Sequence, residues 1–437
     1  MFARVSFASC PTSFIFLLAI ISNLILAIIQ PRIDWRDQAE PTRIAVSIAG
    51  NQGFSSPFRS VDKSPVYTGP SAWIPPVYPY LLAGIFRVFG VFTVTSAWVA
   101  VAVNIIVHAF TCVVLYWAAR ETFGLRSGVY AAIALATFPL LFYPLVLLHI
   151  LGNVYIGWGL FIPPTLLWYT HLSELAIMLL IWLTLRQPNW AVYGMTWGIG
   201  ALINPGLLSL LPAFLAYRLW HRDHWYHLGL AAATAAVCVA PWLARNCLVF
   251  GHPVFIRDNF GVELRAGNQP GGMGLWNPNV IPDHNAYELT RVVKMGEPSY
   301  AQVAGQEAMD SIRSRPGEFA QNTVLRIAYF WIGTPPPSHL LPQRLQALRF
   351  LKLLPLTTLS FLAFYGAGRA LRRGNGKALL FAAVLFFYPL VYYITHVVWG
   401  FQYQYAIEPV MLGLATSVFI REDTTKVLEP NAPTRAE

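Results

Sequence analysis

Long uninterrupted runs of apolar residues dominate the chain, and polar residues gather between them. The apolar runs fall at about 13–30, 75–91, 95–118, 128–148, 150–168, 171–186, 190–204, 206–220, 226–247, 348–369, 378–397 and 404–420. A helix needs about 20 apolar residues to cross a bilayer, and continuous runs lack the alternation of a membrane β-barrel. The pattern predicts an all-α polytopic membrane protein, a bundle of about 10–12 helices.

Two long polar stretches, at 31–74 and 248–325, interrupt this pattern and hold most of the carboxylates. They divide the chain into an N-terminal transmembrane module (1–247, with a first outer loop at 31–74), a second outer region (248–325), C-terminal helices (326–420) and a polar tail (421–437). Pro163-Pro164 and Asn204-Pro205-Gly206 interrupt apolar runs. Such breaks persist in a membrane where protein or a cavity covers the freed backbone.

Composition supports a membrane protein and argues against a nucleic-acid partner. Hydrophobic residues make up 56% of the 437 residues and charged residues 11%, against roughly 25% charged residues in soluble domains. The net charge is +10, but the basic residues sit in short loops, where they set membrane orientation. They are not interleaved with stacking aromatics as in a nucleic-acid groove.

The basic turns predict which side of the membrane each loop occupies. Arg186, the turn at 221–224 and the turn at 369–377 are expected in the cytoplasm by the positive-inside rule. Both long polar stretches then lie on the opposite side, and the tail after residue 420 is cytoplasmic. The turn at 120–126 fits this orientation poorly.

A cluster of charged residues, from Asp34 to Arg43, follows the first apolar run. Carboxylates at the edge of a membrane helix are costly to place and are functional candidates. The spacing predicts a helix over 39–49, with Glu40 and Arg43 on one face and Asp37 at its entry. Two interpretations are open. The segment is an amphipathic helix that lies on the membrane surface with its acids at the mouth of a cavity, or it is a surface helix whose charges are solvated.

The other candidate residues border the two polar stretches. Tyr78 stands where a Gly- and Pro-rich loop re-enters the membrane, and Arg245-Asn246 end an apolar helix. An arginine there clamps an anionic head group or extends to the interface. Glu263 and Arg326 belong to a polar, aromatic region that suits a sugar or phosphate ligand, or forms a small packed cap without one.

Cysteines and histidines give no signature of a metal site or of nucleophilic catalysis. The four cysteines (Cys10, Cys112, Cys238 and Cys247) have no metal-ligand spacing and are interpreted as buried thiols. His149, His171 and His284 are scattered, with no second ligand at metal spacing. We therefore expect no metal and no cofactor.

Three features together resemble the GT-C glycosyltransferases. They are the acidic motif after the first helix, a loop that runs into Pro75-Pro76-Val77-Tyr78-Pro79, and a helix end at Pro241-Trp242-Leu243-Ala244-Arg245-Asn246. The likeness is to the bacterial branch related to protein mannosyltransferases and aminoarabinose transferases. It implies transfer of a sugar, with inversion, from a polyprenyl phosphate to a hydroxyl or amine of a glycan, lipid or protein acceptor. It also implies a bacterial inner-membrane protein with its active site on the periplasmic face.

The resemblance assigns roles to particular residues. The family's catalytic acid falls on Asp37, with Gln38 where many relatives have a second acid, so that Glu40 is the replacement candidate. Residues 402–405 stand where relatives have an Arg-Tyr pair, which leaves Arg245 and Arg326 as phosphate-clamp candidates. The chemistry agrees, because an acceptor hydroxyl needs a positioned base and developing phosphate charge needs arginine.

Two other functions share parts of this pattern. A polyprenyl-linked glycan polymerase or ligase has the same donor and sidedness. A lipid-sugar flippase or transporter is expected to show paired repeats and polar residues deep in the bundle. The sequence shows no internal repeat, and Glu174 and Glu408 are the main acids within apolar runs.

Overall fold

The computed structural model describes residues 11–29, 40–60, 62, 64–141, 163–186, 188–334, 353–398 and 403–420. Over these ranges the regular secondary structure is helical, and paired extended backbone is limited to isolated bridges such as Ser55 with Pro70. The predicted all-α fold is confirmed.

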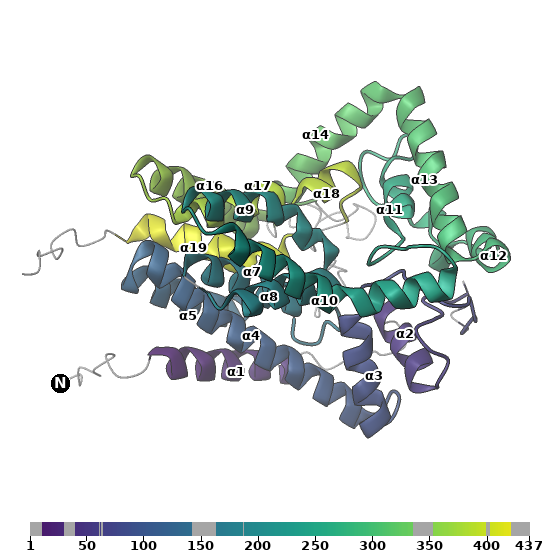
Figure 1. Ribbon diagram of the computed structural model, residues 1–437, viewed down its shortest axis with the longest axis horizontal. Helices are drawn as coiled ribbons and strands as arrows, with labels where there is room; N and C mark the ends of the chain where they lie inside the picture. Colours follow the sequence, from purple (N-terminus) through teal and green to yellow (C-terminus); the bar gives the residue numbers. More distant parts are fainter. Residues whose placement is uncertain are drawn as a thin grey trace, which may run out of the picture.

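Most of the helices run roughly parallel or antiparallel in one bundle (Figure 1). They are α1 (Pro11–Ile29), α4 (Val94–Phe123), α5 (Leu125–Leu141), α7 (Thr170–Leu185), α8 (Trp190–Ile203), α9 (Leu211–Trp220), α10 (Trp225–Phe250), α16 (Leu353–Arg372), α17 (Ala378–Phe387) and α19 (Glu408–Phe419). Within the described ranges, α1, α4 and α10 are long and apolar enough to cross a membrane. The predicted apolar run at 150–168 lies mostly outside the described residues.

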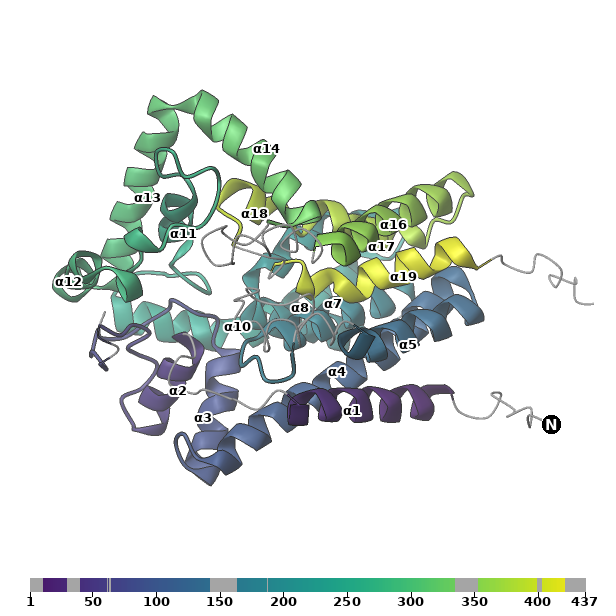
Figure 2. The same ribbon diagram turned by 180° about the vertical axis from the view of Figure 1, so that it is seen from behind.

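The two polar stretches fold together at one end of this bundle, as both views show (Figures 1 and 2). This end layer contains α2 (Glu40–Ala49), α3 (Val77–Phe89), α11 (Phe260–Gly267), α12 (Ala286–Met295), α13 (Glu297–Ser314) and α14 (Pro316–Ile332), with α18 (Leu390–Ile394) beside them. The Asp258 amide donates to the Ala72 carbonyl over 3.2 Å. Segments far apart in sequence are therefore joined into one layer.

The basic turns gather at the other end of the bundle, the end at which α1 begins (Figure 1). Glu121 accepts Arg186 over 3.0 Å and lies 3.6 Å from Lys377. The turn at 120–126 therefore lies with the other basic turns. The expectation that it fits the orientation poorly is wrong, because α4 and α5 form a hairpin whose turn lies at the same end of the bundle as the other basic turns.

The break at Asn204 occurs as expected between two helical segments. Its side-chain oxygen accepts from the Gly206 amide over 3.0 Å, which caps a short 3-10 helix, Pro205–Leu210. Its amide lies 3.4 Å from the hydroxyls of Ser173 and Tyr388. Neighbouring helices thus cover the polar backbone at this break.

The prediction that the cysteines are buried thiols is correct for Cys112 and wrong for Cys247, which is exposed. Cys238 is half-buried, and Cys10 lies outside the described residues. Helix α10 packs on α8 through glycine. A side chain at Gly194 would meet the Ala231 carbonyl at 2.1 Å, so the exposed face of α10, with Cys247 near its end, is turned away from the bundle.

Candidate functional site

Helix α2 spans Glu40–Ala49, within the predicted range of 39–49, with Pro41 in its first turn. One face of the helix is buried, including Thr42, Ile44 and Ala45. Asp37 lies outside the described residues, so its position stays a prediction. The helix is amphipathic and carries Glu40 into the layer formed by the two polar stretches.

Arg43 ties α2 to the second polar stretch. Its Nε donates to the Pro57 carbonyl over 2.6 Å, and a second nitrogen pairs with the Asp283 carboxylate. The other Asp283 oxygen accepts from the Arg59 amide over 3.1 Å. The charge of Arg43 is therefore engaged by protein groups, which argues against a surface helix with freely solvated charges.

Three carboxylates converge around the start of α2. Burial raises the pKa of Glu40, the charges of Asp283 and Glu263 raise it further, and Arg43 opposes them. A carboxyl with a raised pKa is a stronger base once it is deprotonated. A raised pKa is one property expected of a general base, so the electrostatics are consistent with a functional role for Glu40.

Glu263, on α11, is the centre of a hydrogen-bonded group. It accepts from Asn259 over 2.7 Å and lies 3.6 Å from an Arg257 nitrogen. Burial raises the pKa of Glu263, and Arg257 lowers it. This carboxylate is thus held in a fixed orientation beside a cation.

His396 joins this group from the segment that follows α18. Burial lowers the pKa of His396 to about 3, so the imidazole is neutral. Its Nδ1 lies 3.3 Å from the Glu263 carbonyl, which can only accept, so Nδ1 carries the proton. Its Nε2 therefore accepts from the Tyr403 hydroxyl over 2.6 Å. Tyr403 in turn stacks on Tyr392 with ring centres 4.1 Å apart, which gives the site an aromatic wall.

Arg257 is a site residue that sequence reasoning missed. Its side chain is 23% exposed, and its Nε is a buried nitrogen with no hydrogen-bond partner among the described residues. Arginine in such a position can donate to an incoming phosphate. Its place six residues before Glu263, at the entry to α11, was the available sequence signal.

Arg245 and Asn246, both predicted to bind substrate, hold backbone instead. Arg245 donates to the carbonyls of Ser71 over 2.7 Å and Phe54 over 2.8 Å, and its guanidinium lies over Trp242. Asn246 accepts from Arg245 and donates to the Val254 carbonyl over 3.1 Å. These contacts fix the first polar stretch onto the end of α10, so the geometry favours a structural role for both residues.

Arg326, the second predicted phosphate clamp, is fully buried in α14. It makes five hydrogen bonds, to the carbonyls of Gly267, Gly274, Tyr393 and Ile394 and to the Asn268 side chain. Every guanidinium nitrogen is occupied, so no donor is left for a phosphate. Arg326 instead fastens the end of α11 to the end of α18, and thereby sets Glu263 against His396.

Tyr78 is also buried, at the start of α3. Its hydroxyl has no hydrogen-bond partner among the described residues. It lies in the apolar core shared by α2 and α3, where its hydroxyl makes no hydrogen bond to a carboxylate of the described residues.

A buried pair of acids lies between the two polar stretches. Glu297 accepts from the Ser71 hydroxyl over 3.0 Å and from the Ala72 amide over 2.5 Å. Burial raises the pKa of Asp258 to about 6, and burial together with the charge of Asp258 raises that of Glu297 well above its usual range. The pair therefore carries one proton at neutral pH, which Glu297 holds, and Glu297 joins the two stretches through Ser71 and Ala72.

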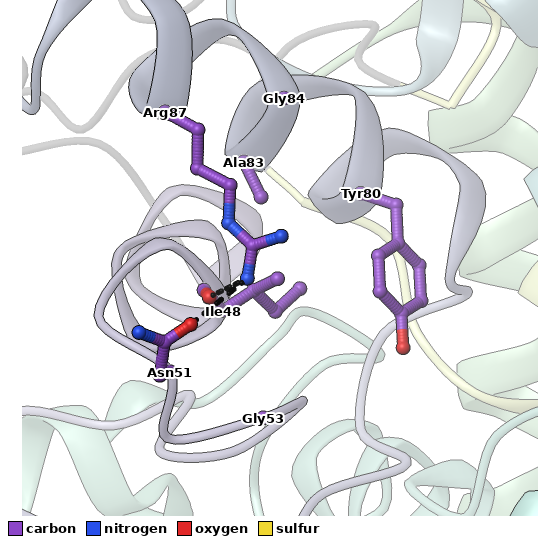
Figure 3. A pocket seen from close by; sticks show the side chains of 7 residues that line it. All are labelled: Ile48, Asn51, Gly53, Tyr80, Ala83, Gly84 and Arg87. Carbon is purple, nitrogen blue, oxygen red and sulfur yellow. Dashed lines mark hydrogen bonds between the residues drawn. The ribbon is translucent and has the colours of Figure 1, made fainter.

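An open cavity of about 400 Å³ lies at the opposite end of α2 (Figure 3). Its lining includes Tyr80 and Arg87 of α3, and Arg87 donates to the Ile48 carbonyl over 2.9 Å. Ile48 follows Glu40 by eight residues, about 12 Å along the helix, so this cavity lies away from Glu40. None of the predicted site residues lines it.

The expectation that the histidines lack neighbouring ligands is wrong for His171. Helix α4 brings His108 beside it, and Glu174 lies one turn further along α7. The spacing of three residues between His171 and Glu174 was a usable sequence signal. His284 lies beside Trp276 in the end layer, and His149 lies outside the described residues.

No family model and no curated protein matches the chain. Among solved structures, it is similar to the archaeal oligosaccharyltransferase AglB from Archaeoglobus fulgidus in complex with an inhibitory peptide and a dolichol-phosphate. The identity is 17% and the TM-score 0.49, over 94% of this chain and 51% of that one. This chain thus spans about half the length of AglB.

The chain is also similar to ArnT from Cupriavidus metallidurans bound to undecaprenyl phosphate. The identity is 15% and the TM-score 0.37, over 94% of this chain and 78% of that one. Likenesses of this degree concern the general arrangement of the helices. The function therefore has to be argued from the residues of this chain.

Proposed function

We propose that this chain is a membrane glycosyltransferase of the GT-C type. It moves a sugar from a polyprenyl-phosphate donor to a hydroxyl or amine of a glycan, lipid or protein acceptor. The reaction takes place where the two polar stretches meet, on the periplasmic face of a bacterial inner membrane. It uses no cofactor beyond the lipid-linked donor. The solved structures named above hold dolichol phosphate and undecaprenyl phosphate, but the proposal rests on this chain's residues.

The carboxylate group around α2 is the observation that carries the proposal. Asp37, three residues before Glu40, takes the proton from the acceptor as general base, and Glu40 is its partner or replacement. The acceptor oxygen or nitrogen then attacks the anomeric carbon from the side opposite the phosphate. The bond from that carbon to the phosphate oxygen breaks, polyprenyl phosphate leaves, and the configuration inverts.

Arg257 is the residue of this chain best suited to hold the donor phosphate. Its unpaired Nε and its position beside Glu263 supply a positive charge where negative charge develops on the leaving group. In this proposal Glu263 orients Arg257 and contacts the sugar. Arg43 fixes the position of α2 through its ion pair with Asp283. Arg245 and Arg326 act by fixing the backbone around them.

The proposal is tested by measuring glycan transfer in membranes carrying Asp37→Asn or Glu40→Gln at wild-type expression. We expect Asp37→Asn to abolish transfer and Glu40→Gln to reduce it. The matched control is Glu318→Gln, because Glu318 is an acid of the same layer that contacts Arg315 and the Gly271 amide instead of the carboxylate group. Full activity in both site variants refutes the carboxylate mechanism.

A lipid-sugar flippase is the second candidate, and one observation favours it. His108, Glu174 and Glu408 lie buried within the bundle, and polar residues at that depth are a feature expected of a transporter. Proteoliposomes separate the two functions, because a flippase moves the donor across the bilayer without forming product. A polymerase or ligase is distinguished by the chemical identity of the acceptor.

A further inference from the structure

A second group of ionisable side chains lies inside the bundle, apart from the carboxylates around α2. His108 is near the middle of α4, and His171 and Glu174 are near the start of α7. Their exposed fractions are 4%, 1% and 1%. One ligand atom from each residue falls in a group whose members all lie within 4.8 Å of one another.

The distances within this group suit ligands around an ion better than hydrogen bonds. A Glu174 oxygen, Oε2, lies 3.6 Å from His108 Nδ1 and 3.5 Å from His171 Nδ1. Among the described residues these three atoms have no hydrogen-bond partner. With bonds of about 2.0–2.2 Å, the ligand atoms of a tetrahedral zinc ion stand about 3.4 Å apart.

The surroundings orient the ligands as a metal site requires. His171 Nε2 lies 3.4 Å from the Pro163 carbonyl, and metal-binding histidines commonly donate their second ring N–H to such an oxygen. Asn104, one turn before His108, donates to the carbonyls of Pro164 over 2.9 Å and Leu166 over 3.0 Å. These bonds hold the turn before α7 against α4 and fix the spacing of the two helices.

Charge gives an independent reason for a cation. Glu408, at the start of α19 and 5% exposed, is close enough for its charge to act on Glu174 and His108. Of these acids, Glu174 lies beside the two histidines, and an ionised carboxylate buried in an apolar bundle needs a compensating positive charge. Among the described residues, the two His108 nitrogens, His171 Nδ1 and Glu174 Oε2 have no hydrogen-bond partner, and a metal ion between them would supply both the charge and the missing contacts.

We propose that His108, His171 and Glu174 bind a zinc ion between α4 and α7. Water, or the thiol of Cys112 one turn along α4 from His108, supplies the fourth ligand, because two imidazoles, a carboxylate and a thiolate or water suit zinc. The ion fixes the start of α7. Tyr169, two residues before His171, lies near the charges of Arg257 and Glu263, so the ion supports the floor of the candidate site. The proposal is independent of the glycosyltransferase function.

The test is zinc content of the purified full chain in detergent, stripped with a chelator, reloaded with zinc sulfate and separated from free metal. Elemental analysis is expected to find about one zinc ion per wild-type chain, and close to none in His108→Asn and Glu174→Gln. The matched control His252→Asn alters an exposed histidine outside the bundle and is expected to retain the ion.

Two results overturn the proposal: a wild-type chain that keeps no zinc, or Glu174→Gln and His108→Asn chains that keep as much as the wild type. If the variants fail to fold, cobalt replaces zinc in the wild type alone. A visible spectrum of tetrahedral cobalt with nitrogen ligands then supports the site, and its absence refutes it. Zinc is also expected to raise the wild-type melting temperature by mass action, and to leave that of Glu174→Gln unchanged.

Discussion

Replacing each of two arginines with glutamine tests the proposal that Arg257 holds the donor, whereas Arg326 holds the fold. Arg257→Gln removes a cation with an unpaired nitrogen in the candidate site. Arg326→Gln removes a guanidinium whose five hydrogen bonds all go to protein acceptors. We predict that Arg257→Gln loses activity but stays stable, and that Arg326→Gln loses stability.

The magnitudes follow from these contacts. Five hydrogen bonds at about 1 kcal/mol net each contribute about 5 kcal/mol, which is comparable with the total unfolding free energy of many proteins, about 5–15 kcal/mol. Arg326→Gln is therefore expected to lower the melting temperature sharply and to reduce expression. Loss of one donor to developing charge costs a factor of about 10²–10³ in rate, so Arg257→Gln is expected to lose that much activity.

The assay measures transfer rate per folded molecule and the melting temperature of both variants in the same detergent. Arg257→Lys serves as the conservative control and is expected to recover part of the activity, because it keeps the charge but not the planar geometry. The reasoning is refuted if Arg257→Gln unfolds the protein while Arg326→Gln stays folded and loses donor binding.

Three further predictions concern protonation and packing. Because the pKa of Glu40 is raised, the transfer rate is expected to climb with pH until this group is deprotonated, and Glu40→Gln should change that limb of the pH–rate profile. The folded-state pKa of Asp258, about 6, exceeds its ordinary 3.8. Protonation of Asp258 therefore stabilises the folded protein; this stabilisation is fully present below about pH 4 and is lost as the pH rises through 6. Asp258→Asn should remove about 3 kcal/mol of pH-dependent stability, so that the melting temperature falls less between pH 4 and pH 6, and an unchanged slope would contradict the raised pKa of Asp258. Gly267→Ala is expected to displace His396 and lower activity, because its new carbon would meet the Thr395 carbonyl at 1.9 Å. Gly229→Ala, which meets nothing within 4 Å, is the control, and equal losses would argue against this packing.

The fold could be read from the sequence largely because membrane helices are specified locally. An uninterrupted apolar run such as 95–118 determines its own helix, observed as Val94–Phe123, since each backbone group is satisfied within the segment. The short helix at Glu40 followed from its spacing and from Pro41. The place of the 120–126 turn did not, because it depends on how the α4–α5 hairpin packs.

The candidate site was harder to predict, because its contacts join residues far apart in sequence. Glu40 lies near Asp283, and the sequence has no local pattern that links them. An arginine at a helix end looks the same whether its donors point to a ligand or to backbone carbonyls. The sequence therefore favoured Arg245 and Arg326, and tertiary contacts showed that Arg257, beside Glu263, has a buried nitrogen with no hydrogen-bond partner among the described residues.

The central claim is that the chain consumes a polyprenyl-phosphate sugar. Mass spectrometry of lipid-linked sugars and surface glycans tests it most directly, in a deletion strain complemented with wild-type or Asp37→Asn protein. The account predicts that one sugar-lipid species accumulates in the deletion and Asp37→Asn strains while one glycan modification disappears, and that wild-type protein reverses both changes. Unchanged lipid-linked sugars and unchanged glycans in the deletion strain would contradict it.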